Sequence, residues 1–259
     1  MLFSVNHNSS KKQEEDEIKC PVNQLGLIIK DLRAREVVRA NIMVFSGEYL
    51  DEIIEQVELV KKAVGDNYTI ECRNYGDLIA ILKKGYHAYH YYPVTDWESF
   101  QVLVELGVSD IYIDGPLCFQ AERVSKAAKE HNIKIRISPS VSPNISPAAS
   151  PAPNSFFIRP EDLEIYSPYF DIIDFQASNQ DQQDTLFSIY KKGSFLFDFN
   201  FIVETLHEEP ILCGLISKEF AKNRLNCKQI CKIPGESCHL CFSEFANARL
   251  VEKIVATHE

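Results

Sequence analysis

The sequence predicts an α/β protein, a (β/α)8 TIM-like barrel of parallel strands with a C-terminal cysteine-rich metal-binding segment. Three observations predict this fold class. Short β-branched runs alternate with amphipathic helical stretches along most of the chain. The length of 259 residues, with 45% hydrophobic and 25% charged residues, suits one globular barrel. Five of the eight cysteines fall close together near the C-terminus.

The first nineteen residues are expected to form a disordered tail. The stretch from Asn6 to Lys19 is rich in Ser, Lys, Asp and Glu and has little apolar surface to bury. We therefore expect residues 20–212 to form the barrel. Residues 213–259, the cysteine-rich segment, are expected to complete the same domain.

Eight runs are candidate strands of the barrel. They are Ile42–Phe45, Tyr68–Cys72, Tyr86–Tyr92, Asp110–Ile113, Lys134–Ile137, Ser155–Ile158, Asp171–Phe175 and Phe195–Phe199. Helices are expected between them at Tyr49–Val64, where apolar residues repeat at helical spacing, after Asp96, and at Gln120–His131. Strands separated by helices pair in parallel, because a crossover must connect them.

A Ser- and Pro-rich stretch interrupts this alternation at residues 138–154. Repeated proline fixes φ and removes backbone donors, so neither a helix nor a central strand fits. The alternation resumes afterwards, which favours an exposed surface loop over a linker between domains. A protein partner could contact this loop or the N-terminal tail.

Polar residues at the ends of the predicted strands are candidates for the chemistry of a barrel. Asp114 ends the run Ile-Tyr-Ile-Asp-Gly-Pro and is the strongest single candidate. Arg136 and Arg159 complete the predicted catalytic set. Together with Arg73 they would hold an anionic substrate, because a guanidinium binds carboxylate or phosphate in a bidentate manner.

Structural roles compete with these interpretations. Asp114 lies in an Asp-Gly-Pro sequence that also favours a turn. Arg159 precedes Pro160 and two acidic residues, a pattern typical of the start of a helix. His87 and His90 are three residues apart and cannot both point into a barrel from a regular strand, so structural roles are expected for them.

The C-terminal cysteines form the array Cys227-x3-Cys231-x6-Cys238-x2-Cys241, preceded by Cys213. Closely spaced thiolates bind Zn²⁺ or a [4Fe–4S] cluster, and both cofactors stay open here. With Zn²⁺, the four cysteines of the array complete the tetrahedron. The three remaining cysteines, Cys20, Cys72 and Cys118, are scattered and are expected to be buried as small hydrophobic residues.

The stretch Asn223–Lys232, Asn-Arg-Leu-Asn-Cys-Lys-Gln-Ile-Cys-Lys, resembles the Asn-Arg-Gly-x-Cys-x-x-x-Cys-Arg motif of peptidase family U32, the collagenase-like protease family. Cys213-Gly-Leu-Ile-Ser-Lys-Glu-Phe is similar to the motif that precedes it there. The resemblance implies a barrel followed by a cysteine-bound iron–sulfur cluster, and hydroxylation of RNA bases or quinone precursors. It also implies that Cys213, Cys227 and Cys231 are cluster ligands, with Cys238 or Cys241 as the fourth.

Three functions follow as hypotheses. The first is an iron–sulfur-dependent enzyme that modifies RNA or a small aromatic substrate. The second is a non-catalytic barrel with structural zinc that binds or assembles partners. A peptidase is third, since the chain has no Gly-x-Ser-x-Gly elbow or His-Glu-x-x-His helix.

Composition limits the partners and the compartment. A net charge of −10 argues against a broad surface for duplex DNA. No apolar run is long enough to span a membrane, and the N-terminus lacks the pattern of a secretory signal, so a cytoplasmic protein is expected.

Overall fold

The computed structural model describes residues 1–6, 17–22, 39–44, 50–141, 156–175 and 180–193, together with Lys222 and Leu225. Within these residues eight strands form one parallel sheet. The strands are β1 (Leu2–Asn6), β2 (Glu17–Pro21), β3 (Arg39–Val44), β4 (Tyr68–Cys72), β5 (Ala88–His90), β6 (Asp110–Tyr112), β7 (Lys134–Ile137) and β10 (Ile172–Asp174).

The order of the strands in the sheet is β5-β4-β3-β2-β1-β10-β7-β6, and every pairing is parallel. The two edge strands, β5 and β6, approach each other. The amide of Ser109 donates to the carbonyl of Ala88 at 2.9 Å, and a parallel bridge joins Val94 to Ile113 beyond the strand ends. No continuous ladder joins β5 to β6 in the described part of the chain.

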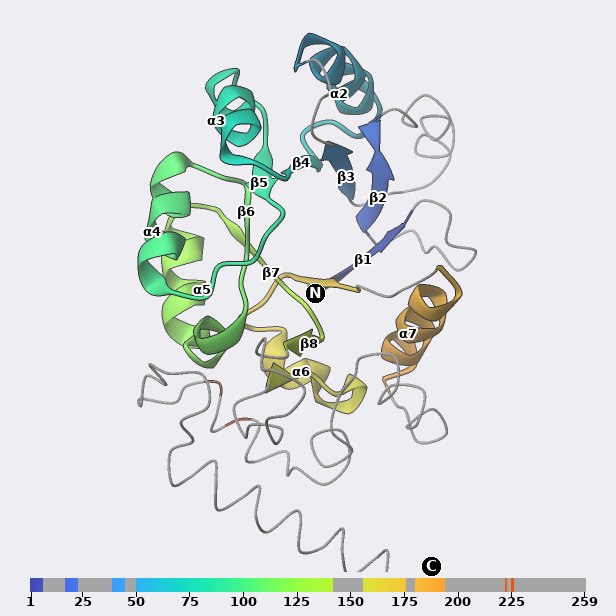
Figure 1. Cartoon of the computed structure of the whole chain (residues 1–259). Coiled ribbons are helices and arrows are strands. Elements are labelled where there is room, and N and C mark those ends of the chain that lie inside the picture. The colour runs from blue at the N-terminus through green and yellow to red at the C-terminus, as the bar shows by residue number, and fades with distance from the viewer. Residues whose placement is uncertain are drawn as a thin grey trace, which may run out of the picture.

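Helices lie on the outer side of this curved sheet (Figure 1). They are α2 (Leu50–Val64), α3 (Tyr75–Lys83), α4 (Trp97–Leu106), α5 (Ala121–Glu130), α6 (Leu163–Tyr166) and α7 (Gln180–Lys192), with 3₁₀ turns η2 (Gly115–Phe119) and η3 (Pro160–Asp162). None of the helices described is both long and apolar enough to cross a membrane.

Local sequence signals set the ends of two of these helices. Asn74 caps α3 by accepting a hydrogen bond from the amide of Asp77 at 2.8 Å. Asp96 caps α4 in the same way with the amide of Ser99. Helix α4 ends at Gly107, whose φ of 73° is the left-handed conformation that glycine adopts most readily.

The hydrophobic core lies between the sheet and the helices. Ile42, Ile70 and Ile135 are fully buried on the outer side of their strands, and they belong to the same cluster as Val57 of α2 and Val124 of α5. Alternate residues of a strand point to opposite faces, so the residues between them point to the inner side. The apolar face of each helix covers this outer side.

The predicted N-terminal tail is wrong for the residues described there. Leu2–Asn6 and Glu17–Pro21 are β1 and β2, and β1 lies in the middle of the sheet, between β2 and β10. These strands escaped prediction because their inner side chains are polar. Ser4 and Glu17 are fully buried, so the low hydrophobicity of this segment reflects a polar interior rather than exposure.

The predicted strands have different outcomes. Tyr68–Cys72 and Lys134–Ile137 match the prediction, but the Ser155–Ile158 run does not join the parallel sheet. Its described part, β9 (Phe156–Phe157), pairs antiparallel with β8 (Ser140–Val141). The Phe195–Phe199 run and most of the predicted Ser/Pro loop lie outside the described residues.

Candidate functional site

The inner side of the sheet is filled by ionised side chains rather than by the branched aliphatic residues that usually fill such a barrel. Arg39 of β3 makes a bidentate pair with Asp110 of β6, at 2.7 and 2.9 Å. Arg136 of β7 makes another with Glu17 of β2, also at 2.7 and 2.9 Å. Arg39 also approaches Glu17 at 3.4 Å. Glu17 and Arg39 face each other across the neighbouring strands β2 and β3. The two bidentate pairs join strands that are not neighbours in the sheet, so they meet through its interior.

The same chain of charges continues towards the carboxyl ends of the strands. Arg136 lies 3.4 Å from Asp174 of β10, and Lys19 of β2 lies 2.6 Å from the same carboxyl group. Lys19 is also 3.2 Å from Glu71 of β4, which accepts a hydrogen bond from the hydroxyl of Tyr89. We call these seven residues the interior charge network. They are Glu17, Lys19, Arg39, Glu71, Asp110, Arg136 and Asp174.

Burial and charge act against each other on these groups. Burial alone would raise the pKa of Glu17, but Arg136 and Arg39 outweigh it and lower this pKa to about 2. Burial would also raise the pKa of Glu71, but Lys19 and the hydrogen bond from the Tyr89 hydroxyl outweigh it, and this pKa is lowered. For Asp174 burial prevails, and its pKa is raised despite Lys19 and Arg136.

Three buried polar atoms of this interior have no hydrogen-bond partner among the described residues. They are Oδ1 of Asp174, Oδ1 of Asn41 and Nε of Arg136. An unsatisfied buried polar atom is costly, and native proteins keep few of them. The interior therefore has hydrogen-bonding capacity that its own described side chains do not use.

A line of rings and one guanidinium lies where β4 and β5 end, and we call it the rim ladder. Tyr75 stacks on His90 with ring centroids 4.2 Å apart and an interplanar angle of 17°. His90 contacts Tyr92 at 5.6 Å, Tyr92 contacts Tyr91 at 5.1 Å, and the guanidinium of Arg73 lies 5.0 Å from the Tyr91 ring centroid. Burial lowers the pKa of His90, which favours the neutral ring.

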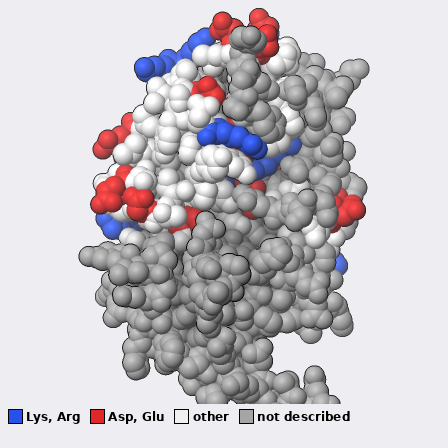
Figure 2. Space-filling model, viewed as in Figure 1, with Lys and Arg blue, Asp and Glu red and all other residues white. Residues whose placement is uncertain are grey.

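The outer members of the rim ladder are open to solvent. Tyr75 is 44% exposed and Tyr92 is 54% exposed, which are high values for aromatic side chains, and Arg73 is exposed as well. In Figure 2, some basic side chains lie near the centre of the described surface and others lie at its edges, where most of the acidic ones also lie. Exposed aromatic rings beside an arginine form a surface suited to binding.

The three predicted catalytic residues have different environments. Arg136 is a member of the interior charge network and is fully buried, so it positions carboxylates and is not a residue of the mouth. Arg159 directly precedes η3 and binds Asp162, the last residue of that turn. These two placements favour the structural roles of both arginines.

Asp114 lies at the predicted strand end and accepts a hydrogen bond from the amide of Gly115. Its carboxyl group caps η2, so the turn role is present. The residue is half-buried, and burial raises its pKa. Asp114 remains a candidate at the carboxyl edge of the sheet, next to β6.

The two histidines have structural contacts, as the sequence indicated. His87 contacts Tyr68, at 5.4 Å between ring centroids, and His90 lies within the rim ladder. Arg73, predicted at the mouth, is the charged member of that ladder. The aromatic residues Tyr75, Tyr91 and Tyr92 were missed. The run Tyr-His-Ala-Tyr-His-Tyr-Tyr contains Tyr91 and Tyr92 and carried a visible signal for them, whereas Tyr75 lies outside it.

The predicted metal ligands, Cys213, Cys227, Cys231, Cys238 and Cys241, lie outside the described residues. Within the described ranges no group of three or more His, Cys, Asp or Glu side chains is arranged to hold a metal ion. The buried roles predicted for the scattered cysteines Cys20, Cys72 and Cys118 are confirmed. Burial raises the pKa of the Cys72 thiol to about 12.

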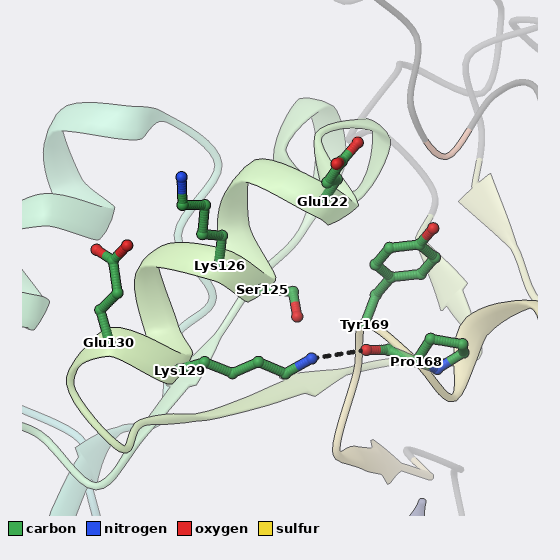
Figure 3. A pocket seen from close by; sticks show the side chains of 7 residues that line it. All are labelled: Glu122, Ser125, Lys126, Lys129, Glu130, Pro168 and Tyr169. Carbon is green, nitrogen blue, oxygen red and sulfur yellow. Dashed lines mark hydrogen bonds between the residues drawn. The ribbon is translucent and has the colours of Figure 1, made fainter.

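A surface groove of about 600 Å³ lies on the helical layer, along α5 (Figure 3). Ser125 and Lys126 of α5 line one side, and Pro168 and Tyr169 line the other. Lys129 spans the groove and donates to the carbonyl of Pro168 at 3.0 Å. The groove has charges of both signs and no cluster of reactive groups.

Comparisons with known proteins leave the family open. No protein-family model and no curated protein matches the chain. Among solved structures, the chain is similar to a glycerol uptake operon antiterminator-related protein from Thermotoga maritima. The identity is 14% and the TM-score 0.38, over 67% of this chain and 94% of that chain. This likeness is too weak to assign a family, and the resemblance to peptidase family U32 stays a prediction.

Proposed function

We propose that this chain is an enzyme with a (β/α)8 barrel that binds a small, planar, anionic aromatic substrate at the carboxyl ends of its strands. The rim ladder is the observation that carries this proposal. Its exposed rings, Tyr75 and Tyr92, can continue their stack onto a planar ring. Arg73 supplies the charge for a carboxylate or phosphate substituent.

The interior charge network supports a catalytic role over a purely structural one. A buried ion network is often no more stabilising than apolar residues of the same volume, so its presence needs another reason. Here the network reaches the carboxyl end of the sheet through Lys19, Glu71 and Asp174. Perturbed carboxyl groups at that end are typical of active sites in parallel barrels.

A matched set of probes tests the substrate class. Uridine 5′-monophosphate and benzoate carry a planar ring, whereas ribose 5-phosphate and cyclohexanecarboxylate carry similar anions without one. Stacking is worth about 1–3 kcal/mol per ring, so we expect the aromatic member of each pair to bind about 5- to 150-fold more tightly in calorimetric titrations. Equal binding within both pairs would remove the proposal.

Variants locate that binding. Tyr92→Leu should abolish the preference for aromatic probes and leave the non-aromatic anions unchanged, whereas Arg73→Met should weaken all four. Tyr169→Leu is the matched control, because Tyr169 lies on the surface groove along α5 and outside the rim ladder. Loss of binding in the control would place the site elsewhere.

The cysteine-rich segment supports a second proposal, that the chain holds a metal centre. Cys227, Cys231, Cys238 and Cys241 suit one tetrahedral zinc ion. Cys213, Cys227, Cys231 and either Cys238 or Cys241 suit a [4Fe–4S] cluster, as the family resemblance implies. A cluster would supply redox chemistry for hydroxylating the aromatic substrate, and zinc would favour a structural role in a binding protein.

Elemental analysis and visible spectra of anaerobically purified protein separate the two metals. We expect iron and a brown colour for the cluster, and a colourless protein with stoichiometric zinc for the structural site. Loss of metal with Cys213→Ser but not with Cys241→Ser supports the cluster, and the reverse supports zinc. Full metal retention in both Cys227→Ser and Cys231→Ser would exclude a centre built on that pair.

A further inference from the structure

The carboxyl group of Asp174 competes for cations that have other partners. Lys19 is shared between Asp174, at 2.6 Å, and Glu71, at 3.2 Å. Arg136 directs its bidentate contact to Glu17 and reaches Asp174 only at 3.4 Å. The interior charge network contains four carboxyl groups and three cations. Arg39 pairs with Asp110 and Arg136 with Glu17, so Asp174 and Glu71 share the remaining cation, Lys19.

The two oxygens of Asp174 have different surroundings. Oδ2 receives both cation contacts, whereas Oδ1 is buried without a hydrogen-bond partner among the described residues. Asp174 is the last residue of β10 and is 2% exposed. Oδ1 is therefore an unused polar atom at the carboxyl end of the interior, the end where the rim ladder lies.

We propose that Asp174 holds a proton at neutral pH and presents it from Oδ1 to a ligand bound at the carboxyl ends of the strands. A carboxylic acid removes the excess negative charge from the network and turns the unused oxygen into a hydrogen-bond donor. Its role as a proton donor to substrate rests on the proposed function. The protonation of Asp174 does not.

The proton transfer is balanced within this site. The O–H bond of Asp174 breaks, a bond from the proton to a basic oxygen or carbon of the ligand forms, and the electron pair stays on the carboxylate. Lys19 at 2.6 Å stabilises the negative charge that results. Solvent returns the proton after the product leaves.

Charged and titratable groups from five strands face Asp174. They are Lys19 of β2, Glu71 of β4, Tyr89 of β5, Tyr112 of β6 and Arg136 of β7. Burial raises the pKa of both tyrosines, so neither loses its proton near neutral pH. Lys134 is half-buried at the start of β7, at the opposite end of the interior.

Two matched substitutions test the charge of Asp174. Asparagine is close in shape to a neutral aspartic acid, so Asp174→Asn should change the midpoint of thermal unfolding at pH 7 by less than about 3 °C. Glu71→Gln removes an ionised partner of the same lysine and should lower the midpoint by at least about 6 °C. An equal loss in both variants, or failure of Asp174→Asn to fold, would show that Asp174 is ionised and overturn the proposal.

Infrared spectroscopy of the unmodified protein gives a second measurement. We expect the carbonyl stretch of a protonated carboxylic acid at pH 7, and its loss in Asp174→Asn but not in Asp114→Asn. Absence of the band would overturn the proposal even if the aromatic probes bind. Presence of the band without binding of any probe would remove the proposed function and leave the protonated Asp174 in place.

Discussion

The two sides of the parallel sheet are built from opposite kinds of residue. On the outer side, Ile42 and Ile70 pack against helices in a continuous apolar core. On the inner side, the neighbouring residues of the same strands, Asn41 and Glu71, are buried among charges. Apolar packing tolerates small changes of shape, whereas a buried charge depends on its partner. The two sides should therefore respond differently to substitution and to pH.

Removing β1 should have the largest effect on stability, because the loss of a central strand disrupts the inner and the outer side of the sheet together. It pairs with β2 and β10 in the middle of the sheet, and the hydroxyl of Ser4 donates to Glu17 at 2.7 Å. We expect deletion of residues 1–6 to abolish the cooperative unfolding transition in calorimetry. A truncated protein with an unchanged midpoint would show that the sheet does not need this strand.

Arg136→Met is expected to have the next largest effect and measures the inner side directly. Removing one member of a buried ion pair costs about 3–5 kcal/mol, because the remaining carboxylate of Glu17 is left buried beside fewer cations. Urea titration gives the free energy of unfolding. Arg136→Lys keeps the charge without the bidentate geometry and should lose less, and an equal loss in both variants would mean that the geometry alone matters.

The pH dependence of stability distinguishes the inner side of the sheet from the outer side, and its expected effect is similar in size to that of Arg136→Met. The folded pKa of Glu17 is about 2, below the ordinary value of 4.5. Its contribution is thus complete above about pH 4.5 and is lost as the pH falls towards 2. This shift of the Glu17 pKa contributes roughly 3 kcal/mol to the free energy of unfolding. The raised pKa of Asp174 acts in the opposite direction, favouring the folded state more at low pH than at high pH.

Urea titrations between pH 6 and pH 2.5 measure the contribution of Glu17 to the free energy of unfolding. Glu17→Gln should flatten the acid limb of the stability curve, whereas Glu52→Gln, on the exposed first turn of α2, should leave the curve unchanged. An acid limb that persists in Glu17→Gln would assign the loss of stability to carboxylates outside the interior charge network.

The outer side of the sheet was largely predictable from the sequence, and the inner side was not. Apolar periodicity located strands such as Tyr68–Cys72 and the helix Tyr49–Val64, since the apolar residues of the strands and of the helix pack against each other in one core. Glu17-Ile-Lys19 and Arg39-Ala-Asn41 also alternate in the manner of strands, but their polar members suggest exposure to a reader who assumes an apolar barrel interior. Only the partners, which come from distant strands, show that these charges are buried.

The candidate site was predictable in part for the same reason. Strand ends pointed to Arg73 and Asp114, which lie at the carboxyl edge. The partners of Arg136 and Arg159, Glu17 and Asp162, were not predicted, because a sequence does not show which carboxylate an arginine will meet. Asp174 falls within the predicted strand Asp171–Phe175, yet nothing local indicates that its Oδ1 lacks a hydrogen-bond partner among the residues that the structure describes.

Ile42→Val on the outer side should have the smallest effect of the four and completes the comparison. Ile42 is fully buried in β3, and loss of one methyl group from such a core costs about 0.5–1.5 kcal/mol. This loss comes from packing and apolar transfer, so urea titrations should give the same difference from the unmodified protein at pH 7 and at pH 2.5. Arg136→Met provides the contrast, since its loss should shrink as Glu17 takes up a proton. If the loss in Ile42→Val also changed with pH, the two sides of the sheet would be coupled, and the inner charges would help to set the packing of the outer core.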